Sequence, residues 1–431
     1  MNTKIVLILL LAIICMACTN GSGQNEEGQY VTEIPVYEGD DIEASKRDEN
    51  LPTAEPTGTV ATITPTEAIV EDIITPTAVP SISPTPIIVA PEKKTLSERI
   101  IVKAQKNNVE EENILLYQVK HDGLYGVINQ YGEVVVEPIY EYIGDFSEGY
   151  ATVRQGKKLG YIDENGTLLT MIEFENAYSF SEGLAAVKVD GLYGFIDTTG
   201  QFVIEPQYKA AVSFSDGLAY VWKEEKEYWE FITPDGAMAF EVHYGNCGSF
   251  HDGLAKVRLT HSSDYYTYGY MDKTGQVVIS PITDGRTKDL PVADFSEGFA
   301  IMYLEKKDNS VVKVYVNTAG EILGGYEFQE AFDFSEGLAY AERDGICGYI
   351  DKTGEYVIMG ASASWFLGGL ASCRTEGKMG FIDKTGKYVI EPIYDICYYG
   401  FGHGYGVVSQ GEELICINKL GEEMWRLLPE E

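Results

Sequence analysis

Two short phrases recur along this chain at nearly regular intervals. The first reads Phe-Ser-Glu-Gly-Leu-Ala or a close variant, and its copies begin at Phe146, Phe180, Phe214, Phe250, Phe295, Phe334, Phe366 and, in degenerate form, Phe401. The second reads Tyr-Ile-Asp-x-x-Gly, and its copies are centred on Ile128, Ile162, Ile196, Ile232, Met271, Val316, Ile350, Ile382 and Ile417. Self-similarity with a period of about 20–50 residues is the signature of a repeat architecture. The sequence therefore predicts an array of about nine units.

The copy around Phe180 shows the expected strands most clearly. Residues 184–189 alternate and end at Asp190-Gly191, a dipeptide that favours a hairpin turn. Residues 192–197 follow and run into Asp-Thr-Thr-Gly, which has Asp and Gly where a type I turn prefers them. Residues 201–204 form a third strand, which we expect to stop at Pro206 because proline cannot donate to a strand ladder. Each unit is thus predicted to be a three-stranded antiparallel meander in an all-β domain.

A single unit is too small to bury a core, so neighbouring units must stack. We expect the Phe of the first phrase, the Ala that follows its Gly by two residues and the Ile of the second phrase to face inward. Two arrangements are open, a superhelical stack and a propeller-like ring. The three-stranded units and the lack of an evident strand exchange between the termini favour the open or incompletely closed form. Insertions near residues 261–268 and 282–291 are expected to form loops on one face, where a binding site is most expected.

The first 18 residues resemble an export signal. Lys4 precedes an apolar run over residues 5–17, which is too short to span a membrane as a helix and fits a signal-peptide core. The sequence Cys15-Met16-Ala17-Cys18 is similar to the lipobox of bacterial lipoproteins, although that family prefers Leu at the position of Cys15. The resemblance implies cleavage and lipidation at Cys18, with the protein anchored on the outer face of the cytoplasmic membrane or at the cell surface. Ordinary secretion and a retained signal anchor are the alternatives.

Residues 19–94 have the composition of a disordered stalk. An acidic stretch comes first, and a Thr- and Pro-rich stretch follows in which Pro residues fix φ and disfavour helix. Thr95-Leu96-Ser97-Glu98 then has the pattern of a capping box, and residues 96–105 have helical character. We predict a short helix or cap within residues 95–113, ahead of the repeat domain at residues 114–431.

The repeat units closely resemble the WG repeat family of bacterial proteins. The best copies run from Tyr193-Gly194-Phe195-Ile196-Asp197 to Tyr208, and from Met379-Gly380-Phe381-Ile382-Asp383 to Asp395. The eponymous Trp is replaced in most copies, because its positions hold Tyr125, Leu159, Tyr193, Trp229, Tyr268, Cys347 and Met379. These bulky residues indicate a packing position. The resemblance implies a β-repeat fold and no particular biochemical activity.

The charge and the cysteines limit the partners. With 67 acidic and 32 basic residues the formal charge is −35, which disfavours binding to nucleic acids. Outside the signal region lie Cys247, Cys347, Cys373, Cys397 and Cys416. We interpret them as buried free thiols because an odd number does not complete a disulfide framework, with one disulfide between Cys373 and Cys397 as the alternative.

No residue pattern supports a metal site, a cofactor or catalysis. His243, Cys247 and His251 are spaced by four residues, which would align ligands on a helix, but this stretch lies between strands. The repeated Asp residues of the second phrase suit calcium, yet Asn takes the same place in other copies, so a turn role explains them better. The Glu of the first phrase is likewise assigned to its turn. No nucleophile, phosphate-loop or zinc-protease motif is present.

Binding is therefore the function that the sequence favours. We expect a non-catalytic cell-surface lipoprotein whose β-repeat platform binds a protein or a cell-envelope glycan. The alternative is a scaffold or sensor subunit of an envelope protein complex. Tyrosine rings stack on sugars and peptides while their hydroxyls stay in water, so tyrosines gathered where the repeat pattern is weakest are the candidate binding residues. They are Tyr265, Tyr266, Tyr268, Tyr398, Tyr399 and Tyr405.

Overall fold

The computed structural model describes residues 94–103, 114–226, 228–244, 247–259, 267–280, 292–306, 308, 310–360, 364–402 and 404–430. The predicted signal segment with Cys18, nearly all of the stalk and most of both insertions lie outside the described residues. No helix within the described ranges has the length and apolar character needed to cross a membrane.

The described residues form small antiparallel sheets whose strands follow one another in the chain. The first sheets hold β2 (Leu116–His121), β3 (Leu124–Asn129) and β4 (Val134–Tyr140); β5 (Tyr142–Ile143), β6 (Tyr150–Gln155) and β7 (Lys158–Asp163); and β8 (Asn176–Ala177), β9 (Leu184–Val189), β10 (Leu192–Asp197) and β11 (Phe202–Tyr208). The next two hold β12 (Ala210–Ala211), β13 (Ala219–Trp222), β14 (Trp229–Ile232) and β15 (Met238–Val242); and β16 (Cys247–His251), β17 (Leu254–Arg258), β18 (Tyr268–Asp272) and β19 (Val277–Ile279).

The second half of the chain repeats the arrangement. It contains the hairpin β20 (Phe299–Glu305) and β21 (Val311–Asn317); the 3-10 turn η1 (Leu323–Gly325); β22 (Glu330–Ala331), β23 (Ala339–Arg343), β24 (Ile346–Ile350) and β25 (Tyr356–Met359); and β26 (Leu370–Thr375), β27 (Lys378–Asp383) and β28 (Tyr388–Tyr394). The last sheet holds β29 (Ile396–Tyr399), β30 (Tyr405–Gln410), β31 (Glu413–Asn418) and β32 (Glu423–Leu427), with β1 (Ile100–Val102) at its edge.

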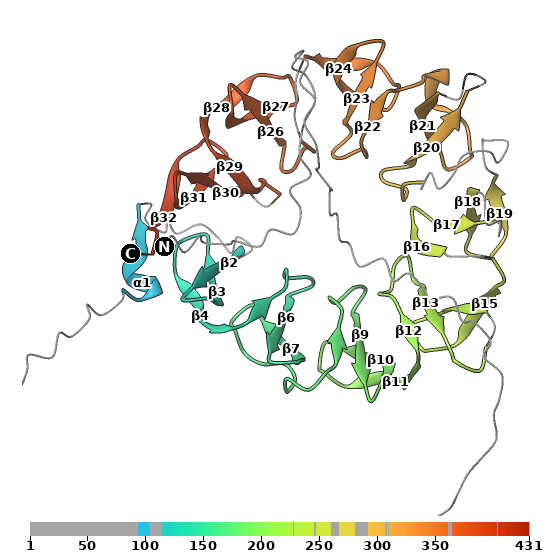
Figure 1. Cartoon of the computed structure of the whole chain (residues 1–431), viewed down its shortest axis with the longest axis horizontal. Helices are drawn as coiled ribbons and strands as arrows, with labels where there is room; N and C mark the ends of the chain where they lie inside the picture. Colours follow the sequence, from blue (N-terminus) through green and yellow to red (C-terminus); the bar gives the residue numbers. More distant parts are fainter. Residues whose placement is uncertain are drawn as a thin grey trace, which may run out of the picture. The chain divides into compact units, whose positions relative to one another are not determined.

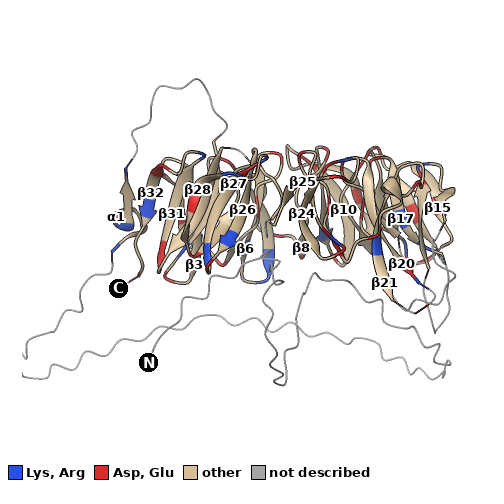
Figure 2. Cartoon of the chain, turned by 90° about the horizontal axis from the view of Figure 1, so that it is seen from above, with Lys and Arg blue, Asp and Glu red and all other residues tan. Residues whose placement is uncertain are grey.

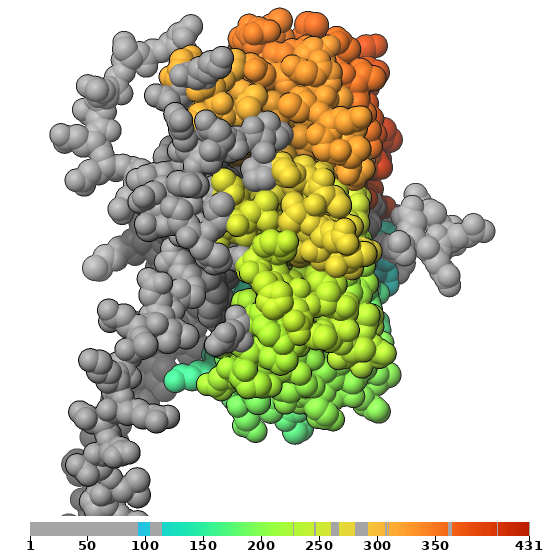
Figure 3. All heavy atoms as spheres, turned by 90° about the vertical axis from the view of Figure 1, so that its right-hand side faces the viewer, coloured from blue at the N-terminus to red at the C-terminus, as the bar shows by residue number. Residues whose placement is uncertain are grey.

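These sheets stand side by side in a propeller arrangement (Figure 1). Seen from the edge of the ring, the strands cross its thickness and the turns gather on two opposite faces (Figure 2). The sheets of the middle of the chain pack directly against one another (Figure 3). Eight sheets in the described part have three to five strands, whereas β20 and β21 form a two-stranded sheet. The predicted number of nine repeat units is therefore not confirmed.

The N-terminal strand closes the ring, so the expectation of an open stack was wrong. Strand β1 pairs antiparallel with β32, and Ile101 lies opposite Arg426. Both ends of the folded region thereby share one sheet. Trp425 is fully buried between the last sheet and the first, and its indole N–H donates to the carbonyl oxygen of Asn129 at 3.0 Å. This exchange could not be predicted from the repeats, because the three residues of β1 lie apart from any repeat phrase.

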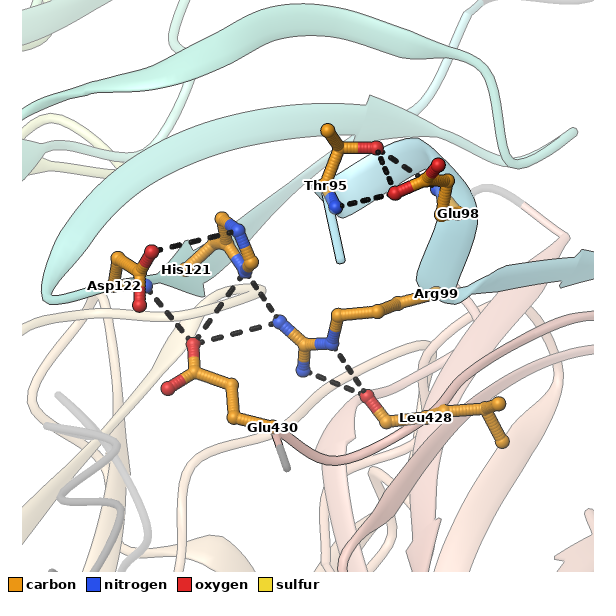
Figure 4. Close-up of polar contacts among 7 residues, drawn as sticks. All are labelled: Thr95, Glu98, Arg99, His121, Asp122, Leu428 and Glu430. Atoms are coloured by element: carbon orange, nitrogen blue, oxygen red, sulfur yellow. Dashed lines mark hydrogen bonds and ion pairs between the residues drawn. The ribbon is translucent and has the colours of Figure 1, made fainter. Parts of the chain in front are cut away.

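A polar cluster supports the same closure (Figure 4). The guanidinium of Arg99 donates to the carbonyl oxygen of Leu428 from Nε at 3.0 Å and from Nη2 at 2.6 Å. Its Nη1 lies 2.7 Å from Nδ1 of His121 and 3.4 Å from the carboxylate of Glu430. Glu430 also accepts from the backbone N–H of Asp122 at 2.9 Å. These contacts join the residues beside β1 to both the first and the last sheet.

The helix is shorter than the sequence indicated. The capping box of Thr95 and Glu98 is confirmed, because each side chain accepts a hydrogen bond from the backbone N–H of the other residue. Helix α1 (Leu96–Arg99) nevertheless ends after four residues instead of continuing through Gln105. Ile100, Ile101 and Val102 are β-branched, and they pair with the edge strand β32 of the last sheet. These residues therefore form a strand and not a continuation of the helix.

The predicted three-stranded meander is incomplete in two respects. Six sheets contain an additional strand that begins before the first phrase: β5, β8, β12, β16, β22 or β29. The third strand also continues through its proline, since β11 includes Pro206 and reaches Tyr208. A register shift separates the pairs Phe195–Ile204 and Tyr193–Tyr208, and this strand is the outer edge of its sheet. Proline is tolerated at edges and bulges because no ladder hydrogen bond is lost there.

The predicted core is confirmed. Phe180, Ala185 and Ile196 have at most 1% of their surface exposed and pack together between neighbouring sheets.

Gly194 follows the position of the eponymous Trp and lies at the register shift between β10 and β11. A Cβ on Gly194 would lie 2.5 Å from the carbonyl oxygen of Ile204, too close for any side chain. Six of the seven residues at the Trp position belong to or pack against the hydrophobic core clusters of the ring: Tyr125, Tyr193, Trp229, Tyr268, Cys347 and Met379.

Candidate functional site

The turns of the first phrase all lie on one face of the ring. In the third sheet this turn precedes β9 and the Asp-x-x-Gly turn follows the antiparallel β10, so both turns meet at the same end of the strands. Six of these turns carry an acidic residue with a left-handed backbone, with φ between 52° and 56°. We call these six residues the carboxylate ladder: Glu148, Glu182, Asp216, Asp252, Glu297 and Glu336.

Each ladder carboxylate accepts hydrogen bonds from the turn of the following repeat. The carboxylate of Glu148 accepts from the backbone N–H groups of Glu182 at 2.7 Å and Gly183 at 2.8 Å. Equivalent contacts join Glu182 to Gly217, Asp216 to Gly253, Asp252 to Gly298, Glu297 to Gly337 and Glu336 to Gly369. The predicted turn role of these acids is thus incomplete, because they also connect neighbouring sheets.

The Ser of the phrase makes a parallel connection. The hydroxyl of Ser147 donates to the carbonyl oxygen of Phe180 in the next phrase at 2.7 Å. The same bond joins Ser181 to Phe214, Ser215 to Phe250, Ser296 to Phe334 and Ser335 to Phe366. The recurrence of Ser followed by Glu or Asp in most copies was the available signal, but sequence alone does not tell a contact within a turn from one between turns.

Two ladder carboxylates are also held by lysines. Lys352 lies 3.1 Å from Glu297, and Lys384 lies 3.2 Å from Glu336. Burial raises the pKa of Glu297, but hydrogen bonds from Lys352 and from the N–H groups of the next turn outweigh it, so the pKa lies below its usual value. The same balance lowers the pKa of Glu336. Each lysine directly follows the Asp of the second phrase, so the same position of the repeat supplies the ammonium group in both units.

The ladder is interrupted where the last sheets meet the first. Gly368 stands at the ladder position of its turn and carries no carboxylate. A Cβ on Gly368 would lie 1.9 Å from the carbonyl oxygen of Phe401 and 3.1 Å from Nζ of Lys419. No side chain fits there. In the first sheet Leu116 pairs with Asn129 as Leu184 pairs with Asp197, which puts Ile114 at the ladder position.

The interruption leaves polar groups of the described chain without acceptors. Lys419 occupies the position of Lys352 and Lys384, yet it forms no ion pair or hydrogen bond with any described residue. The backbone N–H groups of Glu148 and Gly149 have the same left-handed geometry as the occupied turns, but they too have no partner in the described ranges. Exposed apolar side chains lie in the same turns: Ile114, Trp365, Leu367 and Leu420.

The repeated Asp residues serve their own turns, as predicted. Oδ1 of Asp197 accepts from the N–H groups of Thr199 at 2.8 Å and Gln201 at 3.1 Å. Hydrogen bonds from the Thr199 side chain and the Gln201 backbone hold the pKa of Asp197 below its usual value. Asn takes this role at three positions with the same pattern of acceptance: Asn129, Asn317 and Asn418.

The predicted tyrosines do not form one patch among the described residues. Tyr265 and Tyr266 lie outside those residues. Tyr268 packs against the core around Tyr270, whereas Tyr398 and Tyr405 pack against the cluster around Trp425. Tyr399 is 36% exposed, and its ring centroid lies 5.7 Å from that of Tyr117. A binding role for these tyrosines stays a prediction.

No group of three or more His, Cys, Asp or Glu side chains in the described ranges has the geometry of a metal site. His243 contacts the ring of Tyr228, while Cys247 and His251 belong to β16, so a helix does not align them. None of the five cysteines forms a disulfide with a described residue. Cys373 and Cys416 are buried, whereas Cys247, Cys347 and Cys397 are only partly buried, so the prediction of buried thiols holds for two of the five. Burial raises the pKa of Cys247, Cys397 and Cys416 to about 12.

One shallow hollow of about 490 Å³ is lined by Leu304, Glu305, Lys306 and Asp308 at the tip of the β20–β21 hairpin. Lys306 is already paired with Glu327. The hollow brings together no set of catalytic side chains, and it lies away from the ladder.

Comparison with known proteins agrees with the repeats read from the sequence. Six segments match the WG containing repeat. They are residues 125–158, 160–193, 193–226, 268–307, 315–345 and 379–413. The unit that holds Trp229 lies outside them, although it is the only copy with Trp at the eponymous position. No curated protein matches the chain significantly.

Solved structures share the fold at low sequence identity. A eukaryotic initiation factor is 11% identical with a TM-score of 0.52, over 74% of this chain and 96% of its own. Dipeptidyl peptidase 4 from Porphyromonas gingivalis is 9% identical with a TM-score of 0.39, over 74% of this chain and 59% of its own. Hsv2 from Kluyvelomyces marxianus is 9% identical with a TM-score of 0.31, over 67% and 98%. The first of these similarities supports the fold, and none bears on function.

Proposed function

We propose that this protein is a non-catalytic cell-surface lipoprotein whose β-repeat ring binds a protein or a cell-envelope glycan. The observation that carries the proposal is the use of the repeated acidic residues. The carboxylates of the first phrase join neighbouring turns, and those of the second phrase hold their own turns. The repeated polar groups are thus committed to the scaffold, and the groups that differ between repeats remain for recognition.

The anchor part of the proposal rests on the sequence. The apolar run at residues 5–17, the small residue before Cys18 and the Pro-rich stretch that follows suit a lipid anchor and a stalk. Such a stalk holds a binding ring away from the membrane.

The test is retention of the full chain, purified in detergent, on two matrices: purified wall polysaccharide and immobilised, solubilised envelope proteins. Saturable retention on either matrix supports a binding role. Glycan binding through the tyrosines predicts loss of retention on the polysaccharide when Tyr265 and Tyr266 are replaced by Ala. The absence of saturable retention on both matrices would contradict the proposal.

A further inference from the structure

The residue directly before the Phe of the first phrase differs between repeats. Ser stands there in three successive units, at Ser179, Ser213 and Ser249. Asp stands there in the next two units, at Asp294 and Asp333. We call these two residues the aspartate pair. The repeat thus brings two acidic side chains to equivalent places in neighbouring sheets, at a position where three other units have an uncharged hydroxyl.

The aspartate pair lies at the boundary between the β20–β21 sheet and the β22–β25 sheet. Two contacts define this boundary. The hydroxyl of Ser296 donates to the carbonyl oxygen of Phe334 at 2.9 Å, and the ring centroids of Phe299 and Phe334 are 5.2 Å apart. Asp294 precedes Ser296 by two residues, and Asp333 directly precedes Phe334. Both carboxylates therefore lie at one packed contact between the two sheets.

Only one member of the aspartate pair has a cation. Nζ of Lys256 lies 3.1 Å from the carboxylate of Asp294. Asp333 is partly buried and has no hydrogen bond or ion pair with any residue that the structure describes. Oδ1 of Asp294 is enclosed as well, and it has no hydrogen-bond partner in the described chain. Carboxylate oxygens that are removed from water without a donor or a cation are unfavourable.

Four titratable groups face the carboxylate of Asp333: Asp294, Lys256 of β17, Tyr270 of β18 and Tyr315 of β21. Each tyrosine hydroxyl donates its hydrogen to the backbone carbonyl oxygen that directly precedes one of the aspartates, at 2.7 Å and 2.6 Å. These tyrosines therefore have no hydroxyl hydrogen left for Asp333. Burial raises the pKa of Asp333, the charge of Asp294 raises it further, and Lys256 lowers it by less.

We propose that the aspartate pair is a pH-sensitive contact, in which Asp333 takes up a proton from acidic solution and the boundary between the two sheets becomes more stable. At neutral pH both residues are carboxylates, and Lys256 neutralises only one of them. The proton removes the repulsion between the two side chains and gives Asp333 a hydroxyl hydrogen, which it donates to the carboxylate of Asp294. The inference does not depend on the proposed binding function.

The sign of this pH dependence is opposite to that of the carboxylate ladder. The pKa of Asp333 is raised in the folded state, so the repulsion is present above the folded pKa and is lost as pH falls through it. The pKa of Glu297 is lowered, so the hydrogen bonds of its carboxylate to the turn of Glu336 are weakened as pH falls. Both effects act between the same two sheets. A substitution of Asp333 is therefore compared with the wild type at each pH, since the ladder then contributes equally to both proteins.

Hydrogen exchange of the full chain in detergent measures the effect at the boundary itself. Two amides report on it: that of Ala293, which donates to the carbonyl oxygen of Ile301 at 3.1 Å, and that of Phe332, which donates to that of Tyr340 at 3.0 Å. Protection is expressed relative to the exchange rate of an unstructured amide at the same pH. Asp333→Asn is expected to raise the protection of both amides about two- to fivefold at pH 7, because a repulsion between neighbouring like charges is removed. The gain should shrink as the pH falls to 4.

Asp145→Asn is the matched control. Asp145 has the same place in its repeat, but it accepts a hydrogen bond from Nε2 of Gln118 at 3.0 Å, and the next unit has Ser179 at this place. The amide of Gly144, which donates to the carbonyl oxygen of Thr152 at 2.8 Å, reports on it. No gain in the protection of this amide is expected at pH 7, because no second carboxylate is relieved.

Two further variants test the origin of the gain. Asp333→Ser introduces the residue of three other units and should give a gain of the same sign as Asp333→Asn. In an Asp294→Asn background the gain should be smaller, because the repelling charge is gone and Lys256 is left to Asp333. A gain that is equal at pH 7 and pH 4, or equal with and without the charge of Asp294, would overturn the inference. Lower protection at pH 7 for both substitutions of Asp333, or an equal gain for Asp145→Asn, would do the same.

Discussion

Arg99 and Leu428 are joined by a forked hydrogen bond although 329 residues separate them. The guanidinium of Arg99, which is nearly buried, reaches the carbonyl oxygen of Leu428 from two nitrogens. The contact lies beside the β1–β32 pair, and it holds the start of the folded region against its end. Closure of the ring therefore depends on residues that lie outside the repeat phrases.

Arg99→Lys should lower the free energy of unfolding by about 1–3 kcal/mol, because an ammonium group cannot reproduce the planar fork on the partly buried carbonyl oxygen of Leu428. Urea-induced unfolding of the full chain, followed by tryptophan fluorescence, measures the change. The control is Arg154→Lys, since Arg154 is 47% exposed and pairs with Glu141 only at 4.0 Å. Equal effects of the two substitutions would contradict the role of Arg99 in closure.

Gly194→Ala should destabilise the ring by about 2 kcal/mol or more, because the new Cβ would lie 2.5 Å from the carbonyl oxygen of Ile204. The matched substitution is Gly402→Ala, where a Cβ meets nothing within 4 Å and φ is not positive. It is expected to change the free energy of unfolding by at most about 0.5 kcal/mol. Thermal unfolding of both variants provides the comparison. A tolerated Ala at residue 194 would show that the bulge does not require Gly.

Glu336→Gln should make the stability of the ring less dependent on pH. The pKa of Glu336 is lowered in the folded state, so its contribution is present above the unfolded pKa of about 4.3 and is lost as pH falls through the folded pKa. The wild-type chain should therefore lose more stability than the variant between about pH 5 and pH 3. At neutral pH the variant should be about 1 kcal/mol less stable, because a neutral amide is a weaker acceptor for Lys384. Melting temperatures at both pH values test the sign, and parallel pH curves would contradict it.

The thiols of Cys247, Cys397 and Cys416 should react slowly with iodoacetamide in the folded chain. Burial raises each pKa to about 12, so at pH 8 only about one thiol in ten thousand is ionised, against roughly a quarter for an ordinary pKa near 8.5. Peptide mass spectrometry before and after denaturation in urea measures the difference. Rapid labelling of these three positions under native conditions would show that they are not buried as described.

The repeat pattern predicted the core because its positions recur. Phe180, Ala185 and Ile196 occupy places that almost every copy fills with a similar residue, and each copy repeats the same packing. The type I turn role of Asp197 was predictable for the same reason, since Asp or Asn at that position satisfies the turn by itself. Packing and turn contacts that recur in every unit can therefore be predicted from a single sequence.

Contacts between neighbouring units were harder to predict from the sequence. The hydroxyl of Ser147 and the carboxylate of Glu148 bond to the next repeat, yet a turn residue with only local contacts would show the same periodicity. The strand exchange of β1 with β32 leaves no periodic signal, because it occurs once.

The central claim is a ring closed by its own N-terminal strand. Hydrogen exchange of the full chain tests it most directly. The amide of Lys103, which donates to the carbonyl oxygen of Met424 at 2.9 Å, should be protected. Unprotected exchange at Lys103 would contradict the account.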